Sequence, residues 1–171
     1  LIKKFEAGFT AGAKAVNPNI KVQTKYLTQP PDFSGFGSVD KGKTAAEGMY
    51  QNGADVIYHA AGGSGGGVFT AAKAAGKLAI GVDSDQAASP ALAGVKDVII
   101  TSMLKKVDVG VYDFIKSVKE GSFKSGEKVF NLKVNGVGYA TTGGQVDDIK
   151  SKLDDFKQQI IDGKITVPTK P

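Results

Sequence analysis

The stretch DVIYHAA (residues 55–61) decides the fold class of this chain, together with the segments that follow it. It is a short and nearly continuous apolar run, which is typical of a strand buried on both faces of a parallel sheet. Residues 62–67 are glycine-rich and predict a loop, and residues 68–75 predict a helix. The run LAIGV (residues 78–82) is a second buried strand, which ends at Asp83. These segments predict a strand–loop–helix–strand unit of an α/β fold.

The same alternation extends toward the N-terminus. Apolar residues recur at helical spacing over residues 2–16, and Asn17-Pro18-Asn19 is expected to end that helix. Residues 20–27 alternate in hydropathy and predict a strand, followed by a loop over residues 28–39. Asp40 is expected to cap a further helix that stops before Gly53.

The C-terminal half continues the pattern. Residues 98–101 predict a buried strand, a helix is expected from Val107 to Val118, and residues 129–134 alternate as a strand does. A final amphipathic helix is expected over residues 146–160. The whole chain therefore predicts an α/β fold, with a parallel sheet flanked by helices in three α/β/α layers.

Ligands of such sheets bind outside the carboxyl ends of the strands, where the strand order reverses. Three segments follow predicted buried strands and are candidates for a site: residues 61–67, 83–86 and 102–105.

Composition narrows the function. The chain has 171 residues, 41% of them apolar and 23% charged, which is ordinary for a folded domain. No apolar run approaches the ~18 residues of a membrane span. The absence of cysteine excludes disulfides, thiolate metal sites and cysteine nucleophiles. The net charge of +5 is spread along the chain, which favours a lysine-rich surface over a nucleic-acid-binding stripe.

Two glycine-containing motifs suggest different chemistry. The run GGSGGG (residues 62–67) lies between a strand and a helix, where backbone N–H groups can approach a ligand or simply allow a close turn. GSVDKGKT (residues 37–44) matches the P-loop pattern of NTPases. A P-loop directly follows a buried strand, whereas this motif follows a lysine-rich segment and Pro30-Pro31-Asp32, so an NTPase is the weaker alternative.

Four polar residues are candidates for catalysis. Asp83 and Asp85 point to opposite faces of an extended segment, so they are not expected to act as a pair, although either could accept hydrogen bonds from sugar hydroxyls or cap a turn. His59 lacks evident catalytic partners and is expected to be structural. Ser64 has no plausible histidine–carboxylate relay. We expect no enzymatic activity, no cofactor and no metal.

Several stretches together carry a family resemblance: FEAGFTAG (residues 5–12), AAGGSG (60–65), GVDSDQ (81–86), TSMLKKVD (101–108) and GVGY (136–139). In this order they resemble the basic membrane protein (BMP) family, the PnrA-like purine nucleoside-binding lipoproteins of ABC importers. The similarity covers nearly the whole chain.

The resemblance implies a type I periplasmic-binding fold, in which two α/β lobes close on a ligand. Residues 1–96 and 122–171 would form the C-terminal ligand-binding lobe, and residues 97–121 a strand and helix that pack on the N-terminal lobe. Family members carry a lipoprotein signal and a first lobe before this segment. We therefore expect a fragment that lacks most of the N-terminal lobe, and that alone binds nucleoside weakly, associates with itself or rearranges.

The resemblance also implies a binding site. Phe36 would stack on the purine, with Phe33 as a nearby competitor. Asp83 and Lys105 would hold the ribose hydroxyls, and the backbone around Gly63 and Gly65 would lie close to the nucleoside. An aromatic ring suits a purine face, and vicinal hydroxyls suit an ionised Asp and a Lys.

The expected partners are a purine nucleoside (guanosine, inosine or adenosine) and ABC permease subunits, at a cell surface reached by a lipid anchor or in a periplasm. No nucleic acid is expected as a partner. Besides the NTPase, two alternatives stay open: a sugar- or autoinducer-binding protein of the same fold, and the effector domain of a transcription regulator.

Overall fold

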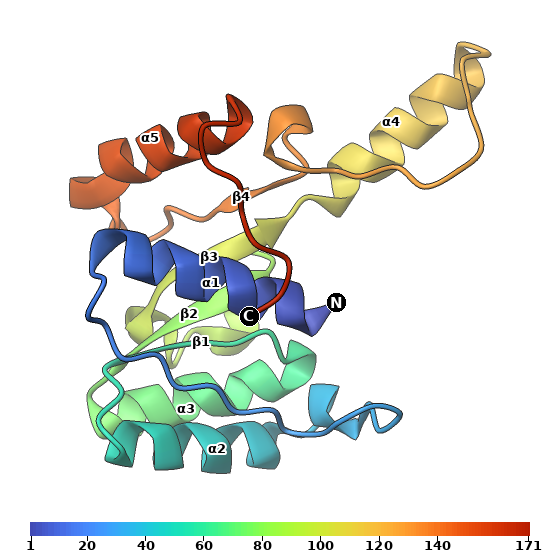
Figure 1. Cartoon of the computed structure of the whole chain (residues 1–171). Helices are drawn as coiled ribbons and strands as arrows, with labels where there is room; N and C mark the ends of the chain where they lie inside the picture. The colour runs from blue at the N-terminus through green and yellow to red at the C-terminus, as the bar shows by residue number, and fades with distance from the viewer.

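The computed structural model describes residues 1–171 and contains one four-stranded sheet in the order β1-β2-β3-β4. The strands are β1 (Val56–Tyr58), β2 (Leu78–Asp83), β3 (Ile99–Lys105) and β4 (Val137–Tyr139). The pairs β1–β2 and β2–β3 are parallel, as predicted. The pair β3–β4 is antiparallel, which corrects the expectation of a wholly parallel sheet. The chain returns from α4 at the carboxyl end of β3, so β4 runs back along its neighbour (Figure 1).

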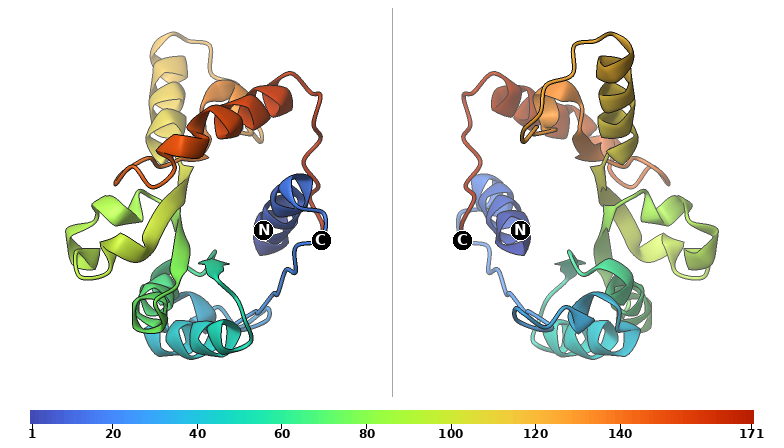
Figure 2. Two further views of the ribbon diagram at one scale, coloured as in Figure 1. Left: turned by 90° about the vertical axis from the view of Figure 1, so that its left-hand side faces the viewer. Right: turned by 90° about the vertical axis from the view of Figure 1, so that its right-hand side faces the viewer.

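The chain forms five α-helices: α1 (Ile2–Val16), α2 (Val39–Gln51), α3 (Gly65–Ala75), α4 (Val107–Lys119) and α5 (Lys150–Ile161). Helices α2 and α3 cover one face, and α1 and α5 lie on the other side (Figure 2). On that side Phe9 of α1 packs against Tyr58 of β1, with ring centroids 5.2 Å apart. The predicted α/β/α fold class is confirmed.

The hydrophobic core lies between the α2–α3 layer and strands β1 to β3. It comprises Ala46, Tyr50, Ile57, Val68, Phe69, Ala71, Ala72, Ala79, Val98 and Ile99. Phe69 and Ile99 are completely buried. Each such side chain contributes about 1.5–3 kcal/mol relative to an exposed one. This core holds strands β1 to β3 against the α2–α3 layer.

Glycine allows α2 and α3 to approach each other closely. A Cβ atom on Gly42 would lie 2.1 Å from the carbonyl oxygen of Ser64, and one on Gly67 would lie 2.0 Å from that of Val39. Real Cβ atoms do not come so close to backbone atoms. The two glycines are therefore required by helix packing.

The start of α2 differs from the prediction by two residues. Ser38 is the N-cap, and its side-chain oxygen accepts a hydrogen bond from the Lys41 backbone N–H at 3.3 Å. Asp40 lies in the first turn instead, where its negative charge favours the helix N-terminus. Gly53 follows the helix with a φ of +89°, so the predicted stop is confirmed.

Two predicted strands are absent. Residues 20–27 form no backbone ladder, and their long-range bonds use side chains, such as Tyr26 to Glu6. Residues 129–134 also form no strand, because Asn131 accepts a hydrogen bond from the Lys133 N–H and Leu132–Val134 becomes a 3-10 turn. Local side-chain bonding of this kind competes with a strand. The last strand forms only after Asn135 turns the chain with a φ of +55°.

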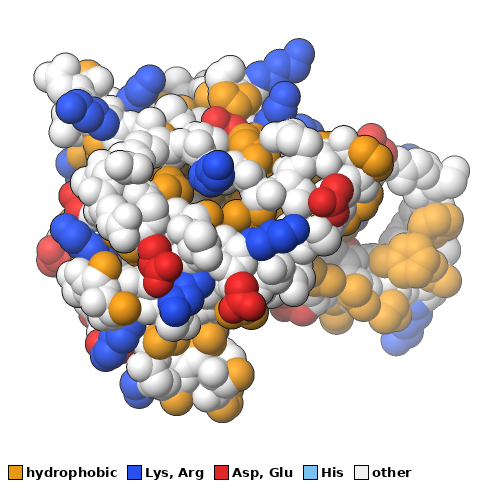
Figure 3. Space-filling view, turned by 90° about the horizontal axis from the view of Figure 1, so that it is seen from below, with side chains coloured by type: hydrophobic (Ala, Val, Ile, Leu, Met, Phe, Trp, Pro, Cys, Tyr) orange, Lys and Arg blue, Asp and Glu red, His pale blue; other side chains and the backbone are white.

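Helix α4 projects from the rest of the molecule (Figure 1) and contains no buried residue. Its exposed apolar side chains are Val107, Val111, Tyr112, Phe114, Ile115 and Val118. The projecting part shows this apolar surface at the right of Figure 3, whereas lysines and acidic residues are interspersed over the face seen from below. No helix combines the length and hydropathy that a membrane span requires.

Candidate functional site

The carboxyl ends of β1, β2 and β3 meet at one edge of the sheet, on the right of Figure 1. Each end leads into a segment that the sequence singled out. The chain after β1 forms the 3-10 turn Gly62–Ser64, β2 ends at Asp83, and β3 ends at Lys105. We call this edge the rim.

Asp83 and Lys105 are brought together at the rim. The Nζ atom of Lys105 lies 2.8 Å from Oδ1 of Asp83. The two side chains are 49% and 48% exposed, so the ion pair remains hydrated. An exposed pair contributes at most about 1 kcal/mol to stability. Both charged groups are therefore accessible to a further partner.

The backbone of Asp83 adopts a conformation that non-glycine residues rarely use. Its φ is +67°, and the Ser84 N–H donates to the Val82 carbonyl oxygen at 2.8 Å, which closes a γ-turn around Asp83. Such turns with positive φ are strained. Backbone strain at a strand end is frequent at binding and catalytic sites.

Phe36 ends the 3-10 turn Ser34–Phe36 and is 41% exposed. Buried Ser64 ties this turn to the glycine-rich loop: its hydroxyl donates to the Gly35 carbonyl at 2.6 Å and accepts from the Ser38 N–H at 2.9 Å. A Cβ atom on Gly63 would lie 3.4 Å from the Phe36 carbonyl oxygen. The structure thus brings Phe36 and Gly63 together.

Phe33 lies just before this turn and is 69% exposed. The residues that anchor the turn to Ser64 are Gly35 and Ser38, which flank Phe36. The backbone on both sides of Phe36 is therefore tied to Ser64, whereas Phe33 lies outside these anchors.

Gly65 has a structural requirement of its own. A Cβ atom at this position would lie 2.1 Å from Cε1 of the His59 ring. His59 is 4% exposed and also packs edge-on against Phe69, with ring centroids 5.1 Å apart. The glycine at residue 65 allows the loop to lie over the imidazole, and its role beside a ligand stays a prediction.

Burial lowers the pKa of His59 below its ordinary value, against the opposing effects of the hydrogen bond with Gln86 and the charge of Asp83. His59 is therefore neutral at pH 7. Burial, with a smaller contribution from Asp83, raises the pKa of the nearby Tyr58 to about 12. Tyr58 consequently stays a neutral phenol.

Asp83 and Asp85 have separate partners. Asp83 pairs with Lys105, whereas Oδ2 of Asp85 accepts a hydrogen bond from the Thr142 hydroxyl at 2.5 Å. The two carboxylates therefore bond to different parts of the chain. No group of three or more histidine or acidic side chains could hold a metal ion.

The P-loop match at residues 37–44 lacks the P-loop context. No strand precedes it, and α2 has already begun at Val39. Gly42 packs against the Ser64 backbone, and Nζ of Lys43 lies 3.7 Å from Oε1 of Glu47 on the same helix. These residues serve helix packing and do not form a phosphate-binding loop.

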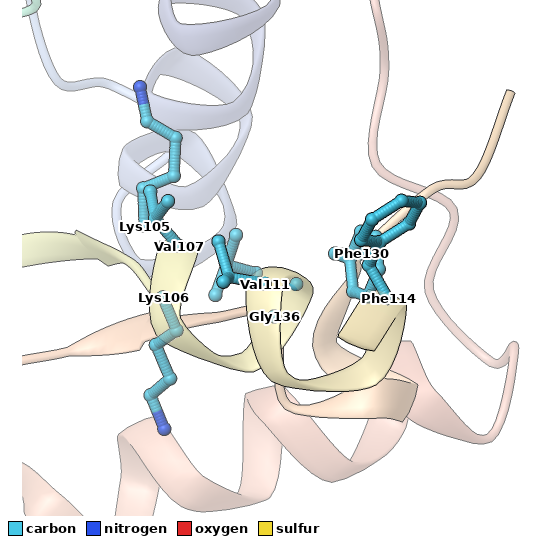
Figure 4. Close-up of a pocket in the computed structure, with 9 residues that line it drawn as sticks. Lys105, Lys106, Val107, Val111, Phe114, Phe130 and Gly136 are labelled. Carbon is cyan, nitrogen blue, oxygen red and sulfur yellow. The ribbon is translucent and has the colours of Figure 1, made fainter. Parts of the chain in front are cut away.

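A hollow of about 460 Å³ lies beside the start of α4 (Figure 4). Its lining is mainly apolar and includes Val111, Phe114 and Phe130. Of the predicted site residues it contains only Lys105, whose side chain extends in the direction opposite to that of Lys106. The absence of Phe36 and Asp83 separates this hollow from the predicted site.

Sequence reasoning missed two residues that organise the rim. Ser64 was considered only as a nucleophile, yet it holds the turn of Phe36. Gln86 lies in the GVDSDQ stretch, which assigns it no role, yet its side-chain oxygen contacts both His59 and the Val82 N–H. Their position beside predicted buried strands could have indicated this role, because buried polar side chains need hydrogen-bond partners.

Comparison with solved structures defines the class of protein. An ABC transporter solute-binding protein from Aeropyrum pernix superposes with a TM-score of 0.71 at 28% identity, over 96% of this chain and 53% of the other. A solute-binding protein from Conexibacter woesei superposes with a TM-score of 0.73 at 23% identity, over 98% and 53%. The fold is that of periplasmic-type solute-binding proteins.

Sequence comparison gives the family. The family described as "ABC transporter substrate-binding protein PnrA-like" matches residues 1–171. This chain therefore belongs to the PnrA-like, or basic membrane protein, family of ABC transporter substrate-binding proteins.

Named relatives agree with this assignment. The CD4+ T-cell-stimulating antigen of Listeria monocytogenes is 41% identical over 100% of this chain, and the ABC transporter nucleoside-binding protein BmpA of Lactococcus lactis is 39% identical over 99%. Basic membrane protein D of Borreliella burgdorferi is 35% identical over 98%. The matches cover 50%, 50% and 48% of these relatives, so the chain spans about half their length.

Proposed function

We propose that the rim of this chain forms one side of a purine nucleoside site in a substrate-binding protein that delivers its ligand to an ABC permease without chemical turnover. The Asp83–Lys105 pair is the observation that carries the proposal. A ribose presents two neighbouring hydroxyls, which can donate to an ionised carboxylate and accept from an ammonium group. Both groups are half exposed and 2.8 Å apart, so one diol can reach both.

Phe36 supports a nucleoside over a plain sugar. Its ring is partly exposed on a turn that Ser64 fixes to the glycine-rich loop. Stacking of an aromatic ring contributes about 0.5–1.5 kcal/mol beyond the burial of apolar area. A pentose without a base would not gain this contribution. The printed name of the Lactococcus relative, a nucleoside-binding protein, points in the same direction.

The His59–Gln86 hydrogen bond supports a single site. His59 leads into the loop that contacts Phe36, and Gln86 follows Asp83 by three residues. The bond at 2.9 Å thus links the two halves of the rim. On this proposal the backbone around Gly63, near the Phe36 carbonyl, and around Gly65, over the His59 ring, would face the nucleoside.

We further propose that residues 1–96 and 122–171 act as one lobe and that residues 97–121 pack on the second lobe. Strand β3 of this segment belongs to the sheet described above, whereas α4 leaves it and exposes six apolar side chains. A second lobe, of the size that the relatives' length provides, would cover this face. A protein of this family would act at the cell surface or in a periplasm, held there by a lipid anchor.

Calorimetric titration of the full-length protein tests the function. Inosine, guanosine and adenosine are expected to bind, with ribose and the free bases much weaker. Phe36→Ala should weaken nucleoside binding about tenfold, from lost stacking and lost apolar burial, and leave ribose binding unchanged. Phe33→Ala is the matched control and should bind as the unmodified protein does.

A sugar-binding protein is the second candidate, because the Asp83–Lys105 pair would suit any vicinal diol. Equal affinity for ribose and inosine, unaffected by Phe36→Ala, would favour it. No binding of either ligand would refute both functions.

A further inference from the structure

Gln86 joins the ends of three strands at the rim. Its side-chain Oε1 accepts the Val82 N–H of β2 at 2.8 Å and faces Nε2 of His59, just after β1, at 2.9 Å. Its backbone N–H donates to the hydroxyl of Ser102 in β3 at 3.1 Å. Ser102 is completely buried. One residue therefore connects the three elements that carry the candidate ligand contacts.

The hydrogen bonds of Gln86 determine the protonation of His59. The atom that accepts from Val82 must be the amide oxygen, so the Nε2 atom of His59 facing it must carry hydrogen and donate. The Ala61 N–H points at Nδ1 over 3.4 Å, which requires Nδ1 to be an acceptor. His59 is thus neutral with its proton on Nε2. Ala61 immediately precedes the glycine-rich turn, so the imidazole also holds that turn.

The same contacts stabilise the strained turn at Asp83. Gln86 accepts a hydrogen bond from the Val82 N–H, and the next residue, Asp83, has the φ of +67°. Gly81 leaves room for this arrangement, because a Cβ atom there would lie 2.6 Å from Oε1 of Gln86 and 2.5 Å from Oγ of Ser102. A strained backbone persists only where its surroundings fix it.

We propose that Gln86 is a positioning residue. Through neutral His59 and the Val82 N–H, it holds the Asp83 carboxylate and the glycine-rich turn in the relative position that one ligand requires. The assignment of a nucleoside as that ligand rests on the function proposed above. Gln86 itself need not contact the ligand, because its side-chain oxygen is occupied by two donors.

Protonation of His59 would disrupt this arrangement. A second proton, on Nδ1, would point at the Ala61 N–H. Two hydrogen-bond donors that face each other repel. The titratable groups facing the ring are few. Asp83, paired with Lys105, approaches from β2, whereas Tyr58 of β1 packs against Phe9 on the other side of the sheet, and Gly65 and Phe69 of α3 are uncharged. Ligand affinity should therefore fall in acid, below the ordinary pKa of histidine near 6.5.

Long-range ¹H–¹⁵N NMR of the imidazole in the full-length protein tests the tautomer. The His59 signals are assigned by their loss in His59→Gln. The expected spectrum shows a protonated Nε2 and an unprotonated Nδ1 at pH 7.5. Protonated Nδ1 in that spectrum would overturn the proposal, with or without a ligand.

Two variants then separate positioning from general stability. Gln86→Met keeps the size but removes the acceptor, and should weaken inosine binding about tenfold, the equivalent of one hydrogen bond. It should also shift the backbone amide signal of Asp83. Gln86→Glu keeps the acceptor and should bind inosine within about threefold at pH 8, less than the effect of one hydrogen bond. Its carboxylate raises the pKa of His59, so affinity should be lost at a higher pH than in the unmodified protein.

Unchanged affinity and an unchanged Asp83 amide in Gln86→Met would refute the positioning role. If Gln86→Met does not fold, the pH profile of Gln86→Glu decides, since an unshifted profile contradicts the proposal. If the unmodified protein does not bind inosine, the nucleoside function is refuted. The His59 tautomer and the shift of the Asp83 amide signal still test the role of Gln86 in that case.

Discussion

Replacement of Gly42 by alanine tests whether this glycine serves helix packing. The new Cβ atom would lie 2.1 Å from the Ser64 carbonyl oxygen. An ordinary contact begins at 3.4 Å, so the backbone must move by about 1.3 Å. Overpacking of this kind costs typically 1–3 kcal/mol, and a clash with backbone belongs at the upper end. Alanine is more favourable than glycine inside a helix by about 1 kcal/mol, which offsets part of this cost. We expect Gly42→Ala to lower the free energy of unfolding by about 2 kcal/mol.

Gly48→Ala is the matched control on the same helix, since nothing lies within 4 Å of its added Cβ atom. It should stabilise the protein by about 0.5–1 kcal/mol. Urea unfolding followed by circular dichroism measures both changes. In thermal unfolding, Gly42→Ala should lower the Tm by about 4–8 °C. Equal effects of the two substitutions would refute the packing argument.

Three further predictions concern single residues of the site and of the P-loop look-alike. Asp83→Asn keeps a residue that tolerates positive φ and removes only the charge, so nucleoside affinity should fall about 10- to 100-fold in calorimetry with little change in stability. The free energy of unfolding should decrease as the pH falls below about 6.5, because unfolded His59 binds a proton that burial disfavours in the folded state. This loss should be absent in His59→Gln, as urea titrations at several pH values would show. Lys43→Ala should leave nucleoside binding unchanged, and a loss of nucleotide hydrolysis in this variant would instead revive the NTPase alternative.

The sequence was sufficient for the parallel part of the sheet. Strands β1 and β2 are short apolar runs that match the burial of both sheet faces, and their boundaries follow the prediction within two to three residues. Strand β3 overlaps the strand predicted over residues 98–101 but is longer, because the polar residues 102–105, which were expected to follow that strand, belong to it. Ser102 is nevertheless buried, since its hydroxyl accepts the Gln86 N–H.

Alternation of hydropathy predicted two strands wrongly, in segments that have no neighbouring strand to pair with. Residues 20–27 and 129–134 both alternate, yet a strand needs a partner edge, and Asn131 offered the backbone a turn instead. The antiparallel β4 could not be predicted, because its direction depends on where α4 returns the chain. These features depend on tertiary structure.

The candidate site was predicted mainly from resemblance. Asp83 and Lys105 were assigned together on that basis, and the ion pair between them is a feature that neither residue's local sequence specifies. Gln86 contacts Val82 only four positions away, but its contacts with Ser102 and His59 join residues 16 and 27 positions apart, which no local motif could indicate. The positive φ of Asp83 was likewise invisible, because aspartate adopts it only where its surroundings require it.

A crystal structure of the full-length protein with bound inosine tests the location of the site most directly. We expect ribose hydroxyls within hydrogen-bond distance of Asp83 and Lys105, and the purine against the ring of Phe36. Inosine in the apolar hollow beside Phe114 and Phe130, or away from the carboxyl ends of β1 to β3, would contradict it.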